Sequence, residues 1–308
     1  MTNTEAFYRL HRFNESFDRN LKVTFGALEG LRTGTFPVAN GRTDLPIGQE
    51  PWRKATSLTD PRSDGENAIR LTATMGIVRV TAALEDFLET LEADYDRTAF
   101  TREAGNAPKI SIEAELQLLK IPSVAARVGI APSPLAYLMP FHRYFTLARN
   151  CIVHRNGRAT HEFEEFAASP ELRDCHSGWI TKRGGPMPAL PNIIAGAEID
   201  WLPRHTILCL AVYYAAAKYL NDQMVILMGS KGLTYMAAHY VIFDADTVAT
   251  RHHRRVEVAI KTVLHNRYRY GEFDNNQLIA ALRAMGKWQS CSSAFAARFG
   301  NEVRGKPR

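Results

Sequence analysis

The chain has 308 residues, of which 45% are hydrophobic and 23% are charged. This balance supports one large hydrophobic core or two smaller ones, and it excludes a wholly disordered chain or a fibrous repeat protein. The net charge is +6, but residues 251–308 hold 12 Lys and Arg against four Asp and Glu, whereas all earlier residues hold 26 against 28. The C-terminal region therefore predicts either attraction to polyanions such as RNA or DNA, or a solvated basic tail.

Hydrophobic residues recur at spacings of three and four over residues 4–32, which predicts one helix or two. Residues 33–65 are rich in Gly, Pro, Asp and Thr and predict a long irregular connection. A long amphipathic helix is expected over 67–95, and a short helical piece over 112–119. The next helix should begin near Leu135 and end at Asn156 and Gly157, because both residue types tolerate positive φ.

A short helix is expected over 162–171, followed by an extended loop rich in Gly and Pro over 184–191. A long apolar helix over 201–228 should be closed by Gly229 and Gly232. Further helices are expected over 233–243, 256–264, 277–285 and 292–299. Strand patterns are almost absent, so the predicted fold class is all-α. The expected regions are a helical segment and irregular loop over 1–65, a helical bundle over 66–230 and a basic helical region over 231–308.

The sequence also indicates where the protein works. The N-terminus lacks the basic start and apolar core of a secretory signal, and the longest apolar run, 207–217, is far short of the roughly 20 residues that cross a bilayer. The four cysteines form no Cys-x-x-Cys pair and no regular spacing with histidine, so they do not form a zinc signature. We expect a cytoplasmic protein with reduced thiols and no membrane partner.

The helix over 135–154 carries one narrow polar strip on an otherwise apolar surface. At about 100° per residue, the strip contains His142, Arg143, Thr146, Arg149, Asn150 and His154. Cationic groups are costly to bury without partners. The strip therefore either pairs with acidic residues of a neighbouring helix, with His142 as a satisfied core histidine, or forms a functional site.

The string from Leu147 to Gly157 resembles the signature of the HEPN superfamily, in which an arginine followed by a polar residue precedes a histidine by a short stretch. In this sequence the signature corresponds to Arg149, Asn150 and His154. Residues 81–91 look like the helix that precedes the motif in many HEPN domains, and Glu85 stands where an acidic residue is often seen. The alternative for the acidic residues of that helix is a solvated charged face. The resemblance spans about residues 66–228.

The resemblance implies a HEPN-like helical bundle, with additional N- and C-terminal helical segments, that cleaves RNA without a metal or cofactor as a homodimer. His154 would transfer protons, Arg149 would stabilise the phosphate, and Asn150 would hold a phosphate oxygen or orient the imidazole. The substrate-binding candidates are Arg155, His142, Arg143 and Glu85. Members of the family that are silenced by nucleotidylation commonly carry a tyrosine where this chain has Asn156, so that regulation is not expected.

The spacing of the motif raises a geometric problem. Arg149 and His154 lie about 140° apart around a regular helix, too far to converge easily on one atom. Either the helix loosens near His154 or a second subunit completes the site, and we favour the second subunit. The resemblance suggests a toxin or antiviral defence effector, with an antitoxin or other regulatory protein as a further partner.

Two other functions compete with the ribonuclease hypothesis. One is a non-catalytic HEPN-like scaffold that binds a nucleotide or RNA. The other is a DNA-binding regulator, in which the helix pair over 277–299 enters a groove. The chain has no Gly-rich phosphate loop, no Gly-x-Ser-x-Gly sequence and no His-Glu-x-x-His sequence, so other common catalytic classes are not indicated.

Overall fold

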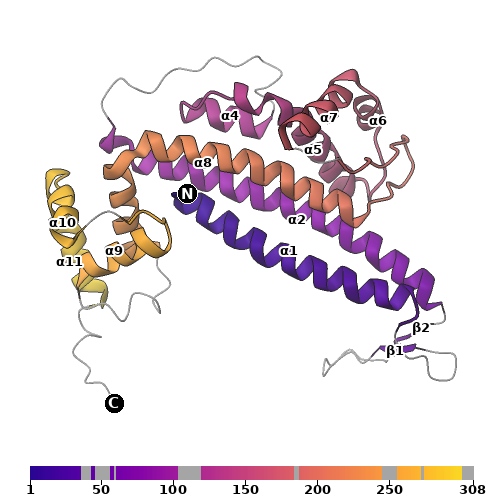
Figure 1. Cartoon of the computed structure of the whole chain (residues 1–308), viewed down its shortest axis with the longest axis horizontal. Helices are drawn as coiled ribbons and strands as arrows, with labels where there is room; N and C mark the ends of the chain where they lie inside the picture. Colours follow the sequence, from indigo (N-terminus) through magenta and orange to yellow (C-terminus); the bar gives the residue numbers. More distant parts are fainter. Residues whose placement is uncertain are drawn as a thin grey trace. The chain divides into compact units, whose positions relative to one another are not determined.

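The computed structural model describes residues 1–35, 43–45, 56–58, 60–102, 119–183, 187–244, 255–271 and 274–299. Within these ranges helices dominate, which confirms the predicted all-α class (Figure 1). The α-helices are α1 (Glu5–Arg32), α2 (Pro61–Arg97), α4 (Lys120–Arg127), α5 (Met139–His154), α6 (His161–Ala167), α7 (Pro170–Arg183), α8 (Pro203–His239), α9 (Val256–Asn266), α10 (Asn275–Ala284) and α11 (Trp288–Phe299). Short helical turns are η1 (Ala99–Thr101), η2 (Ser133–Leu138) and η3 (Tyr240–Asp244).

Several boundaries differ from those predicted. The predicted irregular connection over 33–65 is too long, because α2 already begins at Pro61. Asp60 explains the early start, since its Oδ1 accepts a hydrogen bond from the backbone N–H of Ser63, 3.2 Å away. The same connection contains the antiparallel strands β1 (Thr43–Leu45) and β2 (Thr56–Leu58). Apart from Leu119, the helical piece predicted over 112–119 lies outside the described residues.

Later boundaries also follow local chemistry. The helix predicted over 162–171 is divided into α6 and α7 on either side of Ser169, which precedes a proline and is therefore disfavoured in a helix. Helix α4 was not predicted. Gly229 interrupts α8 as predicted, with φ 56° and ψ −170°. Helix α10 begins at Asn275 because Asp274 and Gln277 form a capping box.

The chain forms two compact units. Unit 1 comprises residues 1–11, 84–134 and 215–308, and unit 2 comprises residues 12–83 and 135–214. Both units combine stretches that are far apart in the sequence, so their bounds do not follow the sequential regions expected at 1–65, 66–230 and 231–308. Helices α1, α2 and α8 each contribute one part to each unit.

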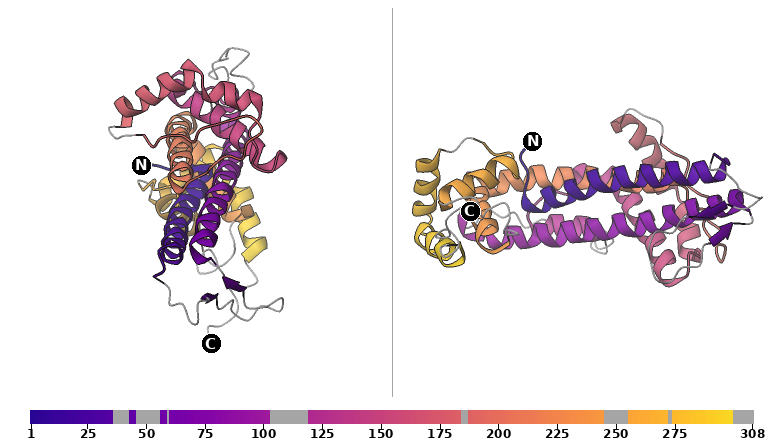
Figure 2. Two further views of the ribbon diagram at one scale, coloured as in Figure 1. Left: turned by 90° about the vertical axis from the view of Figure 1, so that its right-hand side faces the viewer. Right: turned by 90° about the horizontal axis from the view of Figure 1, so that it is seen from below.

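Unit 2 is built on close helix contacts. Figure 2 shows α1 alongside α2, and the Arg79 guanidinium of α2 lies 6.0 Å from the Phe13 ring centre of α1. Helices α2 and α8 approach at Gly76, where an added Cβ would lie 2.6 Å from Thr206 Cγ2. The Thr206 hydroxyl donates to the carbonyl of Ala73 at 2.8 Å. Glycine is therefore needed at position 76, because the neighbouring threonine is fully buried.

Unit 1 contains a buried ion pair near the start of the chain. Glu5 is 2% exposed and accepts two hydrogen bonds from Arg267, one of them 2.6 Å long from Nε. The Arg267 guanidinium lies between the rings of Tyr8 and Tyr240, at 4.0 and 3.9 Å from their centres. Tyr268 also donates its hydroxyl to Glu5, at 3.2 Å. These contacts join the first helix of the chain to the segment that follows α9.

No helix within the described ranges has the combination of length and hydrophobicity needed to cross a membrane.

Candidate active site

The motif helix α5 is anchored by its buried face. Its buried residues include Phe141, Tyr144, Phe145 and Cys151, and the Tyr144 ring packs edge-on against Phe163 of α6 with centres 4.9 Å apart. The helix ends where Asn156 and Gly157 adopt φ values of 53° and 80°, as predicted from their residue types. The backbone N–H of Gly157 then donates to the carbonyl of Cys151 at 3.0 Å. This packing fixes the last turn of α5, which carries the motif.

The three motif residues meet within one chain. Arg149 Nη1 lies 3.3 Å from Asn150 Oδ1 and 3.4 Å from His154 Nε2. The long arginine side chain spans the angle between the two positions, and α5 stays helical to His154, so the helix does not loosen there; completion of the site by a second subunit stays a prediction. Since arginine only donates hydrogen bonds, His154 Nε2 is the acceptor in this contact. We call Arg149, Asn150 and His154 the motif cluster.

The motif cluster lies on an accessible surface. Asn150 and His154 are exposed, Arg149 is half-buried, and the apolar side chain of Val153 beside them is 46% exposed. None of the three hollows identified among the described residues is lined by a residue of the cluster. The cluster therefore faces outward on a firmly packed helix, where a macromolecule can reach it.

His142 does not share this surface. It is 4% exposed, its ring lies edge-on to Tyr213 with centres 5.7 Å apart, and neither ring nitrogen has a hydrogen-bond partner among the described residues. Burial lowers the pKa of His142 to about 4, so the ring is neutral near pH 7. The prediction that His142 belongs to the polar strip and binds substrate is corrected accordingly. Neighbouring parts of the protein cover a wider arc of α5 than the spacing of its apolar residues predicted.

The remaining substrate-binding candidates belong to different elements of the chain. Arg143 is half-buried, with its guanidinium 4.5 Å from the ring centre of Phe166 on α6. Arg155 is exposed and follows the last residue of α5. Glu85 is half-buried on the part of α2 that belongs to unit 1, whereas the motif cluster belongs to unit 2.

The acidic face of α2 has a structural use within unit 1. Glu89 pairs with Lys120 of α4 at 2.8 Å, and Glu92 pairs with Arg127 at 2.9 Å. Arg127 also contacts Asp96 at 2.8 Å. These contacts attach α4 to α2, so the face is neither purely solvated nor free for substrate along its whole length.

A hollow beside the motif helix was not predicted. It has a volume of about 690 Å³ and is lined by Ile152, Asn156 and Gly157 of the α5 end, by Arg70 of α2, and by residues 198–201. Arg70 pairs across it with Asp200 at 2.8 Å. No spacing in the sequence identifies this hollow, because its walls come from three segments far apart in the chain. Ile152 lies about 160° around α5 from Asn150 and His154, so the hollow flanks the motif cluster without containing it.

Within the described residues, no group of three or more His, Cys, Asp and Glu side chains is placed to hold a metal ion. Comparisons of the chain with protein-family models, curated protein sequences and solved structures gave no match. The HEPN resemblance therefore depends on the motif and its immediate surroundings.

Proposed function

We propose that the protein is a metal-independent endoribonuclease of the HEPN type, with Arg149, Asn150 and His154 as its catalytic residues. The observation that carries the proposal is the motif cluster itself. The Arg149 guanidinium lies 3.3 Å from the Asn150 amide oxygen and 3.4 Å from the His154 imidazole on an exposed helix end. These are groups suited to a reaction at a phosphodiester, in which charge is stabilised and protons are moved.

The proposed reaction uses the nucleophile of RNA. The 2′-oxygen attacks the adjacent phosphorus, the bond from phosphorus to the 5′-oxygen of the next nucleotide breaks, and the products carry a 2′,3′-cyclic phosphate and a 5′-hydroxyl. One proton leaves the 2′-hydroxyl and one reaches the departing oxygen. His154 is the proposed acceptor of the first proton, because imidazole can exchange protons near neutral pH. Arg149 then donates hydrogen bonds to the nonbridging phosphate oxygens as their charge grows.

A homodimer forms part of the proposal. Efficient cleavage needs two proton transfers, and one chain places one accessible imidazole beside Arg149. Nearby, His142 is buried, and His161 contacts Glu164 and Glu165 on α6 at 3.3 Å each. A second copy facing the first would supply a second His154 and would cover the exposed Val153. Sedimentation of a fully active protein as a monomer would contradict this part of the proposal.

The biological setting is proposed on the resemblance alone. We place the protein in the cytoplasm as a toxin or antiviral effector, held in check by an antitoxin or other regulatory protein. The basic C-terminal region, whose described part contains α9, α10 and α11, would add nonspecific attraction to RNA.

The direct test is RNA cleavage in EDTA by the wild-type protein, Arg149→Ala and His154→Ala, with product ends analysed chemically. We expect cleavage by the wild type to persist in EDTA and each variant to lose it by a factor of about 100 or more. His161→Ala is the matched control, since it removes another exposed histidine of the same unit. Cleavage that survives both motif variants, or that disappears with the chelator, would refute the proposal.

A further inference from the structure

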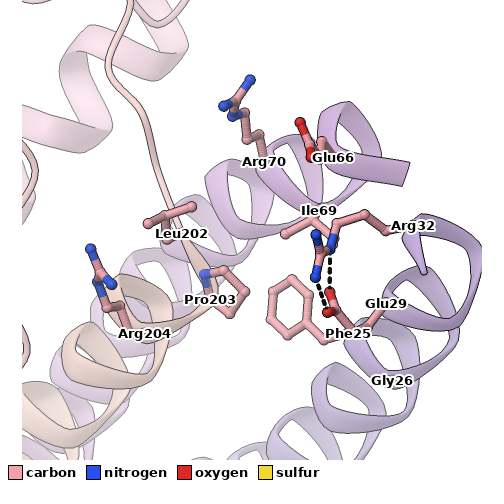
Figure 3. A pocket seen from close by; sticks show the side chains of 10 residues that line it. All are labelled: Phe25, Gly26, Glu29, Arg32, Glu66, Ile69, Arg70, Leu202, Pro203 and Arg204. Atoms are coloured by element: carbon pink, nitrogen blue, oxygen red, sulfur yellow. Dashed lines mark hydrogen bonds and ion pairs between the residues drawn. The ribbon is translucent and has the colours of Figure 1, made fainter. Parts of the chain in front are cut away.

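A second hollow in unit 2 lies between the end of α1, the start of α2 and the start of α8 (Figure 3). We call it the α1–α8 pocket. Its volume is about 760 Å³, within the range of sites that hold small organic ligands. None of its lining residues belongs to the motif cluster.

One wall of the pocket is apolar and includes an aromatic ring. Phe25 from α1, Ile69 from α2, and Leu202 with Pro203 form this wall. Figure 3 shows Phe25 lying between Pro203 and the ion pair of Glu29 with Arg32. Stacking on such a wall would remove water from one face of a flat apolar ligand group and from the wall itself.

One arginine of the lining is available to an anion. Arg204 is exposed and has no carboxylate within ion-pair distance among the described residues; its Nε contacts the ring of His205 at 3.3 Å. Arg70 also lines the pocket, but its guanidinium pairs with Asp200, which lines the hollow beside α5. Glu66, whose contact with Arg62 is 3.6 Å long, supplies a hydrogen-bond acceptor to the same pocket.

Gly26 leaves part of the pocket wall without a side chain. It lies inside α1 and lines the pocket, and an added Cβ would meet no atom within 4 Å. Glycine is a poor helix former, and neither a positive φ nor a close neighbour requires it here. Its effect on the structure is to leave this wall without a side chain, which keeps the pocket open.

We propose that the α1–α8 pocket binds a nucleoside monophosphate. The phosphate lies against Arg204, the base stacks along the wall that includes Phe25, and Glu66 accepts a hydrogen bond from the ribose or from an exocyclic amine. This combination of a cation, a flat apolar wall and an acceptor matches a ligand that carries an anion, a ring and donors. The site is independent of the proposed cleavage reaction, because it uses none of the catalytic residues.

The test is isothermal titration of adenosine 5′-monophosphate into the full chain at low salt, with adenosine and inorganic phosphate as separate ligands. We expect the monophosphate to bind at least 10-fold more tightly than either fragment, since each fragment loses one set of contacts. Arg204→Ala should weaken binding at least 10-fold. Arg12→Ala is the matched control, because Arg12 is also an exposed arginine of unit 2 but lies outside the pocket.

Gly26→Leu separates binding from folding. Leucine favours the helix and finds open space, so the melting temperature should not fall, yet the side chain fills the pocket and should abolish measurable binding. Absence of adenosine 5′-monophosphate binding to the wild type, or unchanged binding by Gly26→Leu or Arg204→Ala, would overturn the proposal. Loss of RNA cleavage in the motif variants would have no bearing on this result.

Discussion

Two arginines in different units show how the surroundings of a side chain change its role. Arg267 in unit 1 reaches the buried Glu5 through a 2.6 Å hydrogen bond and packs against two tyrosine rings. Arg149 in unit 2 makes contacts of 3.3 and 3.4 Å with Asn150 and His154 on an accessible surface. The charge of Arg267 is neutralised by a buried carboxylate. The accessible Arg149 keeps donors that a phosphate can take over.

The difference indicates which polar clusters stabilise the fold and which contribute little to stability. A buried carboxylate needs hydrogen-bond partners from the protein, because it has no water to replace a lost one. The short bonds that Arg267 donates to the buried Glu5 therefore indicate a role in folding. The longer contacts of the motif cluster contribute little to stability, as is usual at a surface. Removing each arginine should separate the two roles.

The largest expected effect on stability is that of Arg267→Ala. It removes the two hydrogen bonds that Glu5 accepts from Arg267, while Arg9 and Tyr268 keep theirs at 2.7 and 3.2 Å, and we expect the free energy of unfolding to fall by about 1.5–3 kcal/mol. Urea denaturation would measure the change. Arg127→Ala is the matched control in the same unit, since its ion pairs with Glu92 and Asp96 are largely exposed and should contribute less than about 1 kcal/mol. Equal losses for the two variants would remove the distinction between buried and exposed pairs.

Asp94 should make the stability of unit 1 fall as the pH rises. Burial raises the pKa of Asp94 from 3.8 to about 7, against the opposing effect of Arg97. Between about pH 4 and pH 7 the folded chain keeps a proton that the unfolded chain has released, so the free energy of unfolding decreases by up to about 1.4 kcal/mol per pH unit. Asp94→Asn should lack this slope in denaturation curves measured across the same range. An unchanged slope would show that Asp94 is already ionised in the folded chain.

His142 should give the opposite and slightly smaller dependence in unit 2. Burial lowers its pKa from 6.5 to about 4, so below pH 6.5 the unfolded chain takes up a proton that the folded chain refuses. The free energy of unfolding should therefore fall as the pH drops from about 6.5 to about 4. His142→Phe retains a ring against Tyr213 and should flatten this part of the profile. A wild-type slope in the variant would assign the effect to other groups.

The sequence pattern predicted which segments form helices better than it predicted which other segments those helices contact. Periodicity identified α1, most of α2 and α5, and residue type predicted the end of α5 at Asn156 and Gly157. The early start of α2 was missed because it depends on one capping aspartate. The motif cluster is local in sequence and could be predicted, whereas the two hollows require segments from distant parts of the chain.

Burial was the property that sequence patterns described least well. The wheel of α5 placed His142 beside Arg149, but the neighbouring helices cover more of its circumference than the apolar residues alone suggested. Glu5 and Arg267 are 262 residues apart, and no local spacing connects them. Tertiary packing decides both cases, since it determines which polar groups lose contact with water.

The most direct measurement compares RNA cleavage and the free energy of unfolding in Arg149→Ala. If Arg149 acts on phosphate and not on folding, single-turnover cleavage in EDTA should fall by a factor of about 100 or more. The free energy of unfolding should stay within about 0.5 kcal/mol of the wild-type value. Undiminished cleavage, or a loss of stability comparable to that of Arg267→Ala, would contradict the assignment of the motif cluster as the active site.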